Sequence, residues 1–254
     1  MSIFAFVQAR MSSSRLPGKI LMDLVGSPML IQQVNRLKRS KLVDEIVVLT
    51  SNDKSDDILI NVCSDHNIKC FRGDLDNVLN RFYQAYLEYK PDHIVRITGD
   101  CPLLDWTVVD QVIQEHLDNP HDYTSNTLNP TFPDGLDVEV MTKECLIKIY
   151  NNASLKVEME HVTYYCYTHK HDFSLQNVEN KMGDQSELRW TVDTPEDFEL
   201  VTDIYEELYE DNSGFSSNEV SHFLKSNRTI ANKNNFINRN EGLNISIRIE
   251  SDDE

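Results

Sequence analysis

Short apolar runs that alternate with helical patterns constrain the fold of this chain more than any other feature. Strands that alternate with helices in this way are typical of an α/β fold with a mostly parallel sheet and helices on both faces. Such sheets bind ligands beyond the carboxyl ends of their strands. The sequence therefore predicts a binding site along that edge. The first predicted strand begins at Phe4, and further strands are predicted at residues 45–50, 68–71 and 93–98. The predicted helices cover residues 27–37, 55–66, 77–89 and 107–117.

The alternation becomes irregular beyond residue 117. Prolines and a glycine in segment 122–141 predict irregular chain that leads into a strand at 136–141. We assign residues 120–187 to an inserted lid or dimerisation subregion within a single domain that covers residues 1–225. The other elements predicted here are a short helix capped by Thr142, a helix at 158–167, and strands at 173–178 and 188–192.

Capping signals predict two helices near the end of the chain. Thr194 and Pro195 are suited to the start of a long helix, and Ser216 with Glu219 forms a capping-box pattern for a final one. The remaining tail, residues 226–254, is rich in asparagine and ends in acidic residues. Its alternating isoleucines fit an edge strand, but its composition favours a loosely held tail.

A basic loop follows the first strand. Arg10, Arg15 and Lys19 occur before the first acidic residue, Asp23, although the formal net charge of the chain is -18. A loop of small residues at the end of a strand exposes backbone N–H groups, and added cations neutralise phosphate charges. This position favours an anion-binding loop. The alternative is a solvated loop whose cations pair with the abundant acids.

Two acidic residues follow predicted strands. Asp100 comes after the strand at 93–98, and Asp193 lies between a strand and a helix. Carboxylate oxygens are ligands that Mg²⁺ prefers, so the pair is a candidate site for one or two Mg²⁺ ions. Alternatively, each acid caps the local backbone, although Thr194 already suits that task beside Asp193.

Composition narrows the range of partners and compartments. The strong negative charge argues against nucleic acid and anionic membranes, because both require broad positive surfaces. Five widely spaced cysteines, an odd number without metal-ligand spacing, favour reduced thiols. The sequence shows neither a leader pattern nor a run of membrane-spanning length. We therefore expect a soluble cytoplasmic protein.

The basic loop also resembles a known pattern. Arg10-x-x-x-Ser14-Arg15-Leu16-Pro17-x-Lys19 is similar to the loop of sugar-nucleotide cytidylyltransferases, which activate acidic keto-sugars such as sialic acids and Kdo. Within that group the chain most resembles the branch named after the spore-coat polysaccharide protein SpsF. Ordered blocks at 72–82, 99–103, 123–128, 132–140, 160–163 and 193–197 extend this resemblance over about residues 3 to 210.

The resemblance implies a Rossmann-like, GT-A-like nucleotide-diphospho-sugar transferase that acts as a homodimer. Its reaction would transfer CMP from CTP to a hydroxyl of a sialic-acid-like or other 2-keto-3-deoxy sugar acid and release pyrophosphate, in surface polysaccharide or glycan biosynthesis. The implied cofactor is Mg²⁺, held by Asp100 and Asp193. Arg10, Arg15 and Lys19 would be catalytic, and Gln8, Ala9, Ser14, Thr50, Arg81 and Gly99 would join them in binding the nucleotide.

The residues assigned to acceptor binding lie in the middle of the chain, except for Arg189, which lies nearer its end. His161 is equally compatible with a packed helix residue or a dimer contact, and Arg189 with an ordinary ion pair. The acceptor candidates are Asn126, Asp137, Glu139, His161 and Arg189.

The sequence is also compatible with two alternative functions. The first is a GT-A-type glycosyltransferase that uses a nucleotide-sugar, because Asp74-Leu75-Asp76 has the form of a metal-nucleotide motif. The second is a non-catalytic nucleotide-binding protein. A fold of this class does not distinguish these activities, so the products released must do so.

Overall fold

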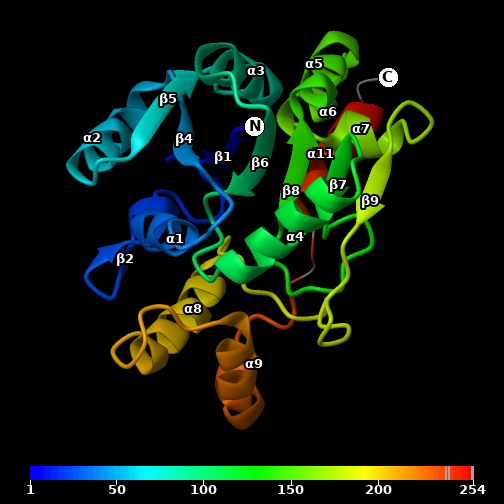
Figure 1. Ribbon diagram of the computed structural model, residues 1–254. Helices are drawn as coiled ribbons and strands as arrows, with labels where there is room; N and C mark the ends of the chain where they lie inside the picture. The colour runs from blue at the N-terminus through cyan, green and yellow to red at the C-terminus, as the bar shows by residue number, and fades with distance from the viewer. Residues whose placement is uncertain (238, 240, 253–254) are drawn as a thin grey trace.

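A seven-stranded mixed sheet forms the centre of the computed structural model, which describes residues 1–237, 239 and 241–252 (Figure 1). The strand order is β5-β4-β1-β6-β8-β7-β9, and β8 alone among these runs antiparallel to the others. The expectation of a mostly parallel sheet is therefore confirmed. The strands are β1 Ile3–Gln8, β4 Glu45–Ser51, β5 Lys69–Gly73, β6 His93–Thr98, β7 Tyr123–Ser125, β8 Glu139–Thr142 and β9 Leu175–Asn177, with a separate hairpin of β2 Asp23–Leu24 and β3 Ser27–Pro28.

Helices cover both faces of the sheet, as Figure 1 shows with α3 and α5 on one side and α1 and α4 on the other. Alternate β1 residues separate accordingly: Ala5 and Val7 pack towards α1 and α4, and Phe6 packs towards α3. The helices are α1 Met29–Leu37, α2 Asp57–Asp65, α3 Val78–Tyr89, α4 Trp106–Asp118, α5 Lys143–Asn152, α6 Lys156–Glu160, α7 Tyr164–Thr168, α8 Pro195–Leu208, α9 Ser217–Ser226, α10 Arg228–Ala231 and α11 Glu241–Asp252.

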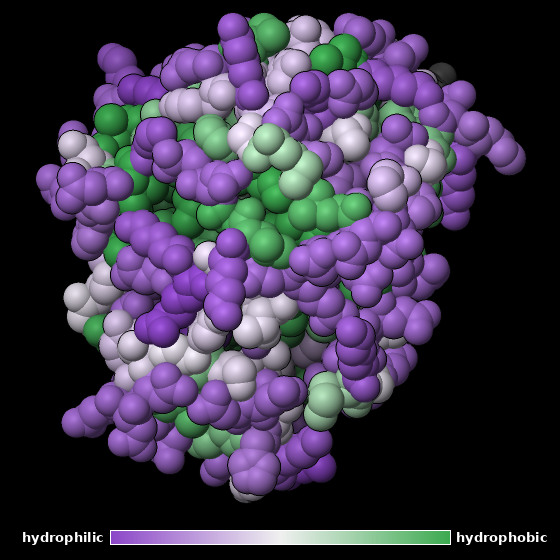
Figure 2. All heavy atoms as spheres, viewed as in Figure 1, coloured by the Kyte–Doolittle hydropathy of each residue, from purple (hydrophilic) through white to green (hydrophobic). Residues whose placement is uncertain are grey.

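The surface reflects this layering. Figure 2 shows a band of hydrophobic side chains across the middle of the viewed face, over the region of β6 and β8, with hydrophilic side chains above and below it. None of the helices in the described part of the chain has the length and apolar character needed to cross a bilayer.

Three predicted elements differ in the structure, and one strand was not predicted. Ser27 does not cap α1, because Ser27 and Pro28 pair with β2 and the helix begins at Met29 without a side-chain cap. The strand predicted at 136–141 is shorter in the structure, because residues 136–138 lie outside β8. The strand β7 was not predicted, because the Tyr-Thr-Ser sequence of β7 is short and carries little apolar signal. The predicted helix at 158–167 is broken at His161 into α6 and α7.

The predicted strand at 188–192 is extended chain outside the sheet. All four residues from Arg189 to Val192 are buried, and the backbone N–H groups of Trp190 and Val192 donate to the carbonyls of Asp134 and Asp100. A single isolated bridge between Arg189 and Asp134 is the β pairing seen in this segment.

The end of the chain also differs from expectation. Segment 241–252 is neither an edge strand nor a loose tail but the helix α11. Ile245 and Ile249 lie four residues apart and therefore share one helix face, which lines a cavity at the carboxyl edge of the sheet. This helix packs against α6, and neither sequence alternative predicted it.

Candidate active site

The basic loop after β1 is fixed at both ends by backbone hydrogen bonds. Ala9 N–H donates to the Leu49 carbonyl on β4, and Met11 N–H donates to Asp56 at 2.7 Å. Gly18, with φ of 73°, adopts the left-handed conformation that glycine accepts most easily and donates to the Met11 carbonyl. The loop therefore leaves the strand in a defined direction, with its serines and cations facing one cavity.

The end of β6 lies directly beside the end of β1. Gly99 N–H donates to the Gln8 carbonyl at 2.8 Å. A Cβ atom at Gly99 would lie 2.9 Å from both Ala9 Cβ and that carbonyl oxygen, so a larger residue would push the two strand ends apart. This close approach places Asp100 opposite the basic loop.

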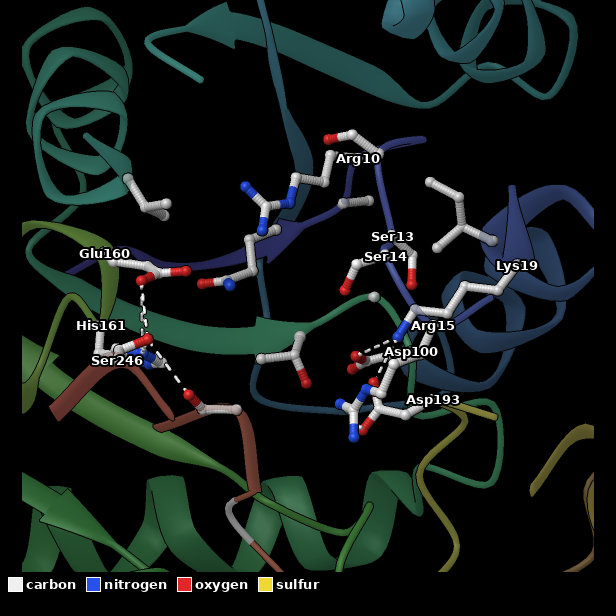
Figure 3. Close-up of a pocket in the computed structure, with 18 of the residues that line it drawn as sticks. Arg10, Ser13, Ser14, Arg15, Lys19, Asp100, Glu160, His161, Asp193 and Ser246 are labelled. Carbon is white, nitrogen blue, oxygen red and sulfur yellow. Dashed lines mark hydrogen bonds and ion pairs between the residues drawn. The ribbon is translucent and has the colours of Figure 1, made fainter. Parts of the chain in front are cut away.

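A cavity of about 530 Å³ lies between the basic loop, β6 and α11. Figure 3 shows two polar groups on its opposite sides, with Lys19, Asp100 and Asp193 at one and His161 at the other. Arg10 extends from the loop between them. Ten residues predicted to bind nucleotide or metal line this cavity: Gln8, Ala9, Arg10, Ser14, Arg15, Lys19, Arg81, Gly99, Asp100 and Asp193.

Lys19 joins the two predicted metal ligands. Its Nζ donates to Asp100 Oδ2 at 2.9 Å and to Asp193 Oδ1 at 2.8 Å. Burial by itself lowers the pKa of Lys19, but the two carboxylates outweigh burial and raise it. Burial likewise tends to raise the pKa of Asp100, yet the Lys19 ammonium lowers it to about 2. Lys19 and Asp100 are therefore both charged at neutral pH.

Arg189 holds Asp193 in place from behind. Its guanidinium contacts Asp134 and Asp193, each at 2.8 Å, and Asp197 at 3.0 Å. Burial alone lowers the pKa of Arg189, but these carboxylates raise it above the usual value. Thr194 caps α8, so Asp193 is not needed as the cap and its carboxylate is directed to the cations. The structure supports the ion-pair interpretation of Arg189, and this residue lines neither this cavity nor the second one that adjoins it.

Arg10 supplies positive charge that no nearby acid neutralises. Across the described residues, no carboxylate lies within ion-pair distance of Arg10, and the side chain reaches into the cavity (Figure 3). Arg81, buried beneath it, donates to the carbonyls of Asp74 and Leu75. Burial, followed by the charge of Arg10, lowers the pKa of Arg81 to about 10. The cavity therefore offers an unpaired cation to an anionic ligand.

A second cavity, of about 880 Å³, adjoins the first, and Thr98 and His161 line both. Three residues predicted to bind the acceptor, Asp137, Glu139 and His161, line this second cavity. Arg96 lies on its floor, paired with Glu139, and donates to Gln8 of the first cavity at 3.1 Å. A polar chain from Gln8 through Arg96 to Glu139 thus connects the two cavities.

Asp137 and His161 both line the second cavity. Burial raises the pKa of Asp137 to about 7, although Arg239, at 2.5 Å, offsets part of this effect. Burial lowers the pKa of His161, so the imidazole is neutral at pH 7. His161 lies at the break between α6 and α7, with its Nε2 3.1 Å from Ser246 Oγ.

Two other predicted contact residues lie outside both cavities. Thr50 is fully buried and donates to Asp56, the carboxylate that anchors the basic loop. Asn126, equally buried, bonds the backbone of Leu136 and Val138 and braces the turn before β8. Both are structural residues one layer behind the surfaces that a ligand would meet.

Three site residues were missed by the sequence reasoning. Arg96 carried a detectable signal, because it is a charged residue inside an apolar strand. Glu241 and Ser246 carried none, because only the tertiary structure brings the end of the chain to the site.

The Asp74-Leu75-Asp76 motif has a local role. Asp74 Oδ1 accepts from the N–H groups of Asp76 and Asn77, which fixes the turn before α3. Neither acid lines the two cavities. The motif therefore gives no support to a glycosyltransferase.

The acid pair at the strand ends has the donor chemistry that Mg²⁺ requires. Mg²⁺ is commonly held by one or two carboxylates, with phosphate oxygens and water completing the shell. Asp100 and Asp193 converge on one ammonium, so their oxygens already face a common point (Figure 3). No larger cluster of potential metal ligands occurs among residues 1–237, 239 and 241–252. The two residues fit a nucleotide-bound Mg²⁺ and not a self-sufficient metal site.

Fold and site together define a class. A basic loop after the first strand of a mostly parallel sheet, facing Asp100 beyond β6 and Asp193 before α8, is the arrangement of a Rossmann-like nucleotidyltransferase. A profile of the cytidylyltransferase family matches residues 4–230. The chain belongs to this cytidylyltransferase family.

Similar proteins span most of the chain. It is 36% identical over 238 residues to an uncharacterised protein of Methanocaldococcus jannaschii, covering 93% of this chain and 96% of that one. It is also 36% identical to the spore coat polysaccharide biosynthesis protein SpsF of Bacillus subtilis, covering 82% and 88%. The solved structure of a cytidylyltransferase from Leptospira borgpetersenii superposes with a TM-score of 0.87 at 32% identity, covering 91% and 97%. The predicted resemblance to the SpsF branch is confirmed.

Proposed function

We propose that this protein transfers CMP from CTP to a hydroxyl of an acidic sugar and releases pyrophosphate, in the synthesis of a surface polysaccharide or glycan. One observation carries the proposal. The cations of the basic loop line one cavity together with Asp100, which follows β6, and Asp193, which precedes α8, and a second cavity adjoins it. In this reaction the acceptor oxygen forms a bond to the α-phosphorus while the bond to the pyrophosphate oxygen breaks.

The loop cations neutralise the phosphates. Arg10 has no carboxylate partner within the described residues, which makes it the group most available to a phosphate. Lys19 is held at the edge of the cavity by two carboxylates and stays protonated because they raise its pKa. Charge that builds on the departing pyrophosphate is stabilised by cations already in position, which is where such sites gain most of their rate.

Asp100 and Asp193 are proposed to hold Mg²⁺. When bound, the ion supplies positive charge to the phosphates. The low pKa of Asp100 keeps its carboxylate ionised and ready to act as a ligand across the physiological pH range. Arg189 orients Asp193 from the buried side.

The second cavity is proposed to take the sugar acid. Its walls combine cations at Arg96 and Lys170 with amides at Asn129 and Asn177. Cations suit a carboxylate, and amides and carboxylates suit several sugar hydroxyls. The polysaccharide role draws on the name of the Bacillus subtilis relative. The homodimer and the cytoplasmic location stay predictions, the first open to analytical ultracentrifugation.

A pyrophosphate-release screen tests the proposed function. The purified protein is incubated with Mg²⁺, each of the four NTPs, and a panel of 2-keto-3-deoxy sugar acids and matched neutral sugars. We expect pyrophosphate only when CTP and a sugar acid are both present. Release of a nucleoside diphosphate or monophosphate from a nucleotide-sugar would instead indicate a glycosyltransferase. CTP binding without turnover on any acceptor would indicate a non-catalytic binder.

A further inference from the structure

The C-terminal helix α11 lies over both cavities, outside the segment that the family profile matches. Gly242, Ile245, Ser246 and Ile249 line the first cavity, and Leu243 lines the second. In Figure 1 the helix, in red, lies beside α6 and α7. A segment at the far end of the sequence therefore forms part of the wall that a ligand would meet.

The first residue of α11 holds one of the phosphate-binding cations. Glu241 Oε2 lies 2.5 Å from Arg15 Nη1, while Arg15 Nη2 contacts Asp193 at 2.9 Å. Both sides of the guanidinium fork are thus occupied by carboxylates. Arginine binds phosphate through the same fork of N–H groups. A phosphate at Arg15 and the Glu241 carboxylate therefore compete for the same donors.

Several further contacts of this segment are polar. Ser246 Oγ donates to Glu160 at 2.9 Å and bonds His161, and Glu250 accepts from the backbone N–H groups of Lys156 and Val157 at the start of α6. Arg239, just before the helix, pairs with Asp137 of the second cavity. The segment is thereby docked onto groups from both halves of the site.

The helix α11 buries little apolar surface against the rest of the protein. Ile245 and Ile249 point to the first cavity but keep 49% and 55% of their surface exposed. Partly exposed ion pairs such as Arg15 with Glu241 contribute at most about 1 kcal/mol each. Docking therefore depends on several weak polar contacts, and an anion that removes one of them shifts the balance towards release.

We propose that α11 is a lid that an incoming triphosphate displaces, with Glu241 as a built-in competitor for Arg15. This proposal rests on the proposed function in one respect, which is that Arg15 faces the phosphates of the bound nucleotide. In the free protein the lid covers both cavities and keeps Arg15 paired. A bound triphosphate takes over Arg15, repels the Glu241 carboxylate and opens the way to the acceptor cavity.

Binding of inorganic triphosphate, measured by calorimetry, tests the competition without requiring turnover or a preference for cytosine. We expect Glu241→Gln to bind triphosphate about three-fold more tightly than the wild type, the effect of one partly exposed ion pair. Glu210→Gln, an exposed site just beyond α8, removes the same charge and controls for net charge. Equal affinities for Glu241→Gln and Glu210→Gln would overturn the competition.

Hydrogen exchange tests the movement of the lid. We expect triphosphate to speed amide exchange in residues 241–252 by about ten-fold or more in the wild type, and Glu241→Gln to show faster exchange there without any ligand. Unchanged exchange on binding would show that only the Glu241 side chain moves, and would overturn the lid. A protein that binds triphosphate but transfers no CMP would contradict the proposed function and leave these results intact.

Discussion

The two ends of the site are built in different ways. At the phosphate end, Lys19 and Asp193 are fixed by buried ion pairs, and the Lys19 side chain is only 9% exposed. At the acceptor end, His161 lies at a break between two short helices and contacts the tail. In the proposed function the phosphate end serves a step common to every acceptor, so it gains from rigidity. The other end, where the sugar acid is proposed to bind, is built from short helices and the C-terminal segment.

The two ends of the site also differ in the pKa values of their buried carboxyl groups. Burial tends to raise the pKa of Asp100 and of Asp137. Lys19 reverses this effect and brings the pKa of Asp100 to about 2, whereas Arg239 offsets only part of it and leaves the pKa of Asp137 at about 7. The phosphate end therefore keeps its charge across physiological pH, and the acceptor end changes charge within it.

Removing Arg189 should produce the largest effect. Arg189→Met leaves three carboxylates near one buried point, including Asp197, which is fully buried. An uncompensated buried charge costs about 3 to 5 kcal/mol of unfolding free energy. Urea unfolding measures the loss, and Arg228→Met, at an exposed position on α10, serves as the control. A loss no greater than that of the control would show that the phosphate end is not rigid in this way.

Lys19→Ala should abolish most activity while the fold survives. Removal of one preorganised charge at a reacting phosphate costs about 100- to 1,000-fold in kcat. Pyrophosphate release measures the rate, circular dichroism checks the fold, and Lys181→Ala, at an exposed turn, is the control. Full activity of Lys19→Ala would remove this lysine from the mechanism.

Asp137→Asn should change the pH dependence of stability. The pKa of Asp137 is raised in the folded state, so the wild type loses stability as the pH rises from about 4 through 7, where the unfolded carboxyl is ionised and the folded one is not. With a discount for its partial exposure, we expect the loss between pH 5 and pH 8 to shrink by about 1 to 2 kcal/mol in Asp137→Asn. Urea midpoints at the two pH values measure it. An undiminished loss would assign the pH response to another group.

Sequence patterns predicted the phosphate end well. The loop cations, Asp100 and Asp193 were identified from their places after strands, and the structure brings them to one cavity. The acceptor end was predicted less well. Asn126 and Arg189 are polar residues in the right part of the chain, but their side chains are satisfied by backbone groups and buried acids.

The sequence by itself determined the alternating fold and the chemistry at the strand ends, because strand burial and loop charge are properties of neighbouring residues. Only the tertiary structure decided which polar residues face a ligand and how the tail folds. The Thr50 side chain donates to Asp56 and does not face the cavity, and Glu241 pairs with Arg15, 226 residues away in the sequence. Pairings of this kind depend on which distant surfaces meet, and no local pattern records them.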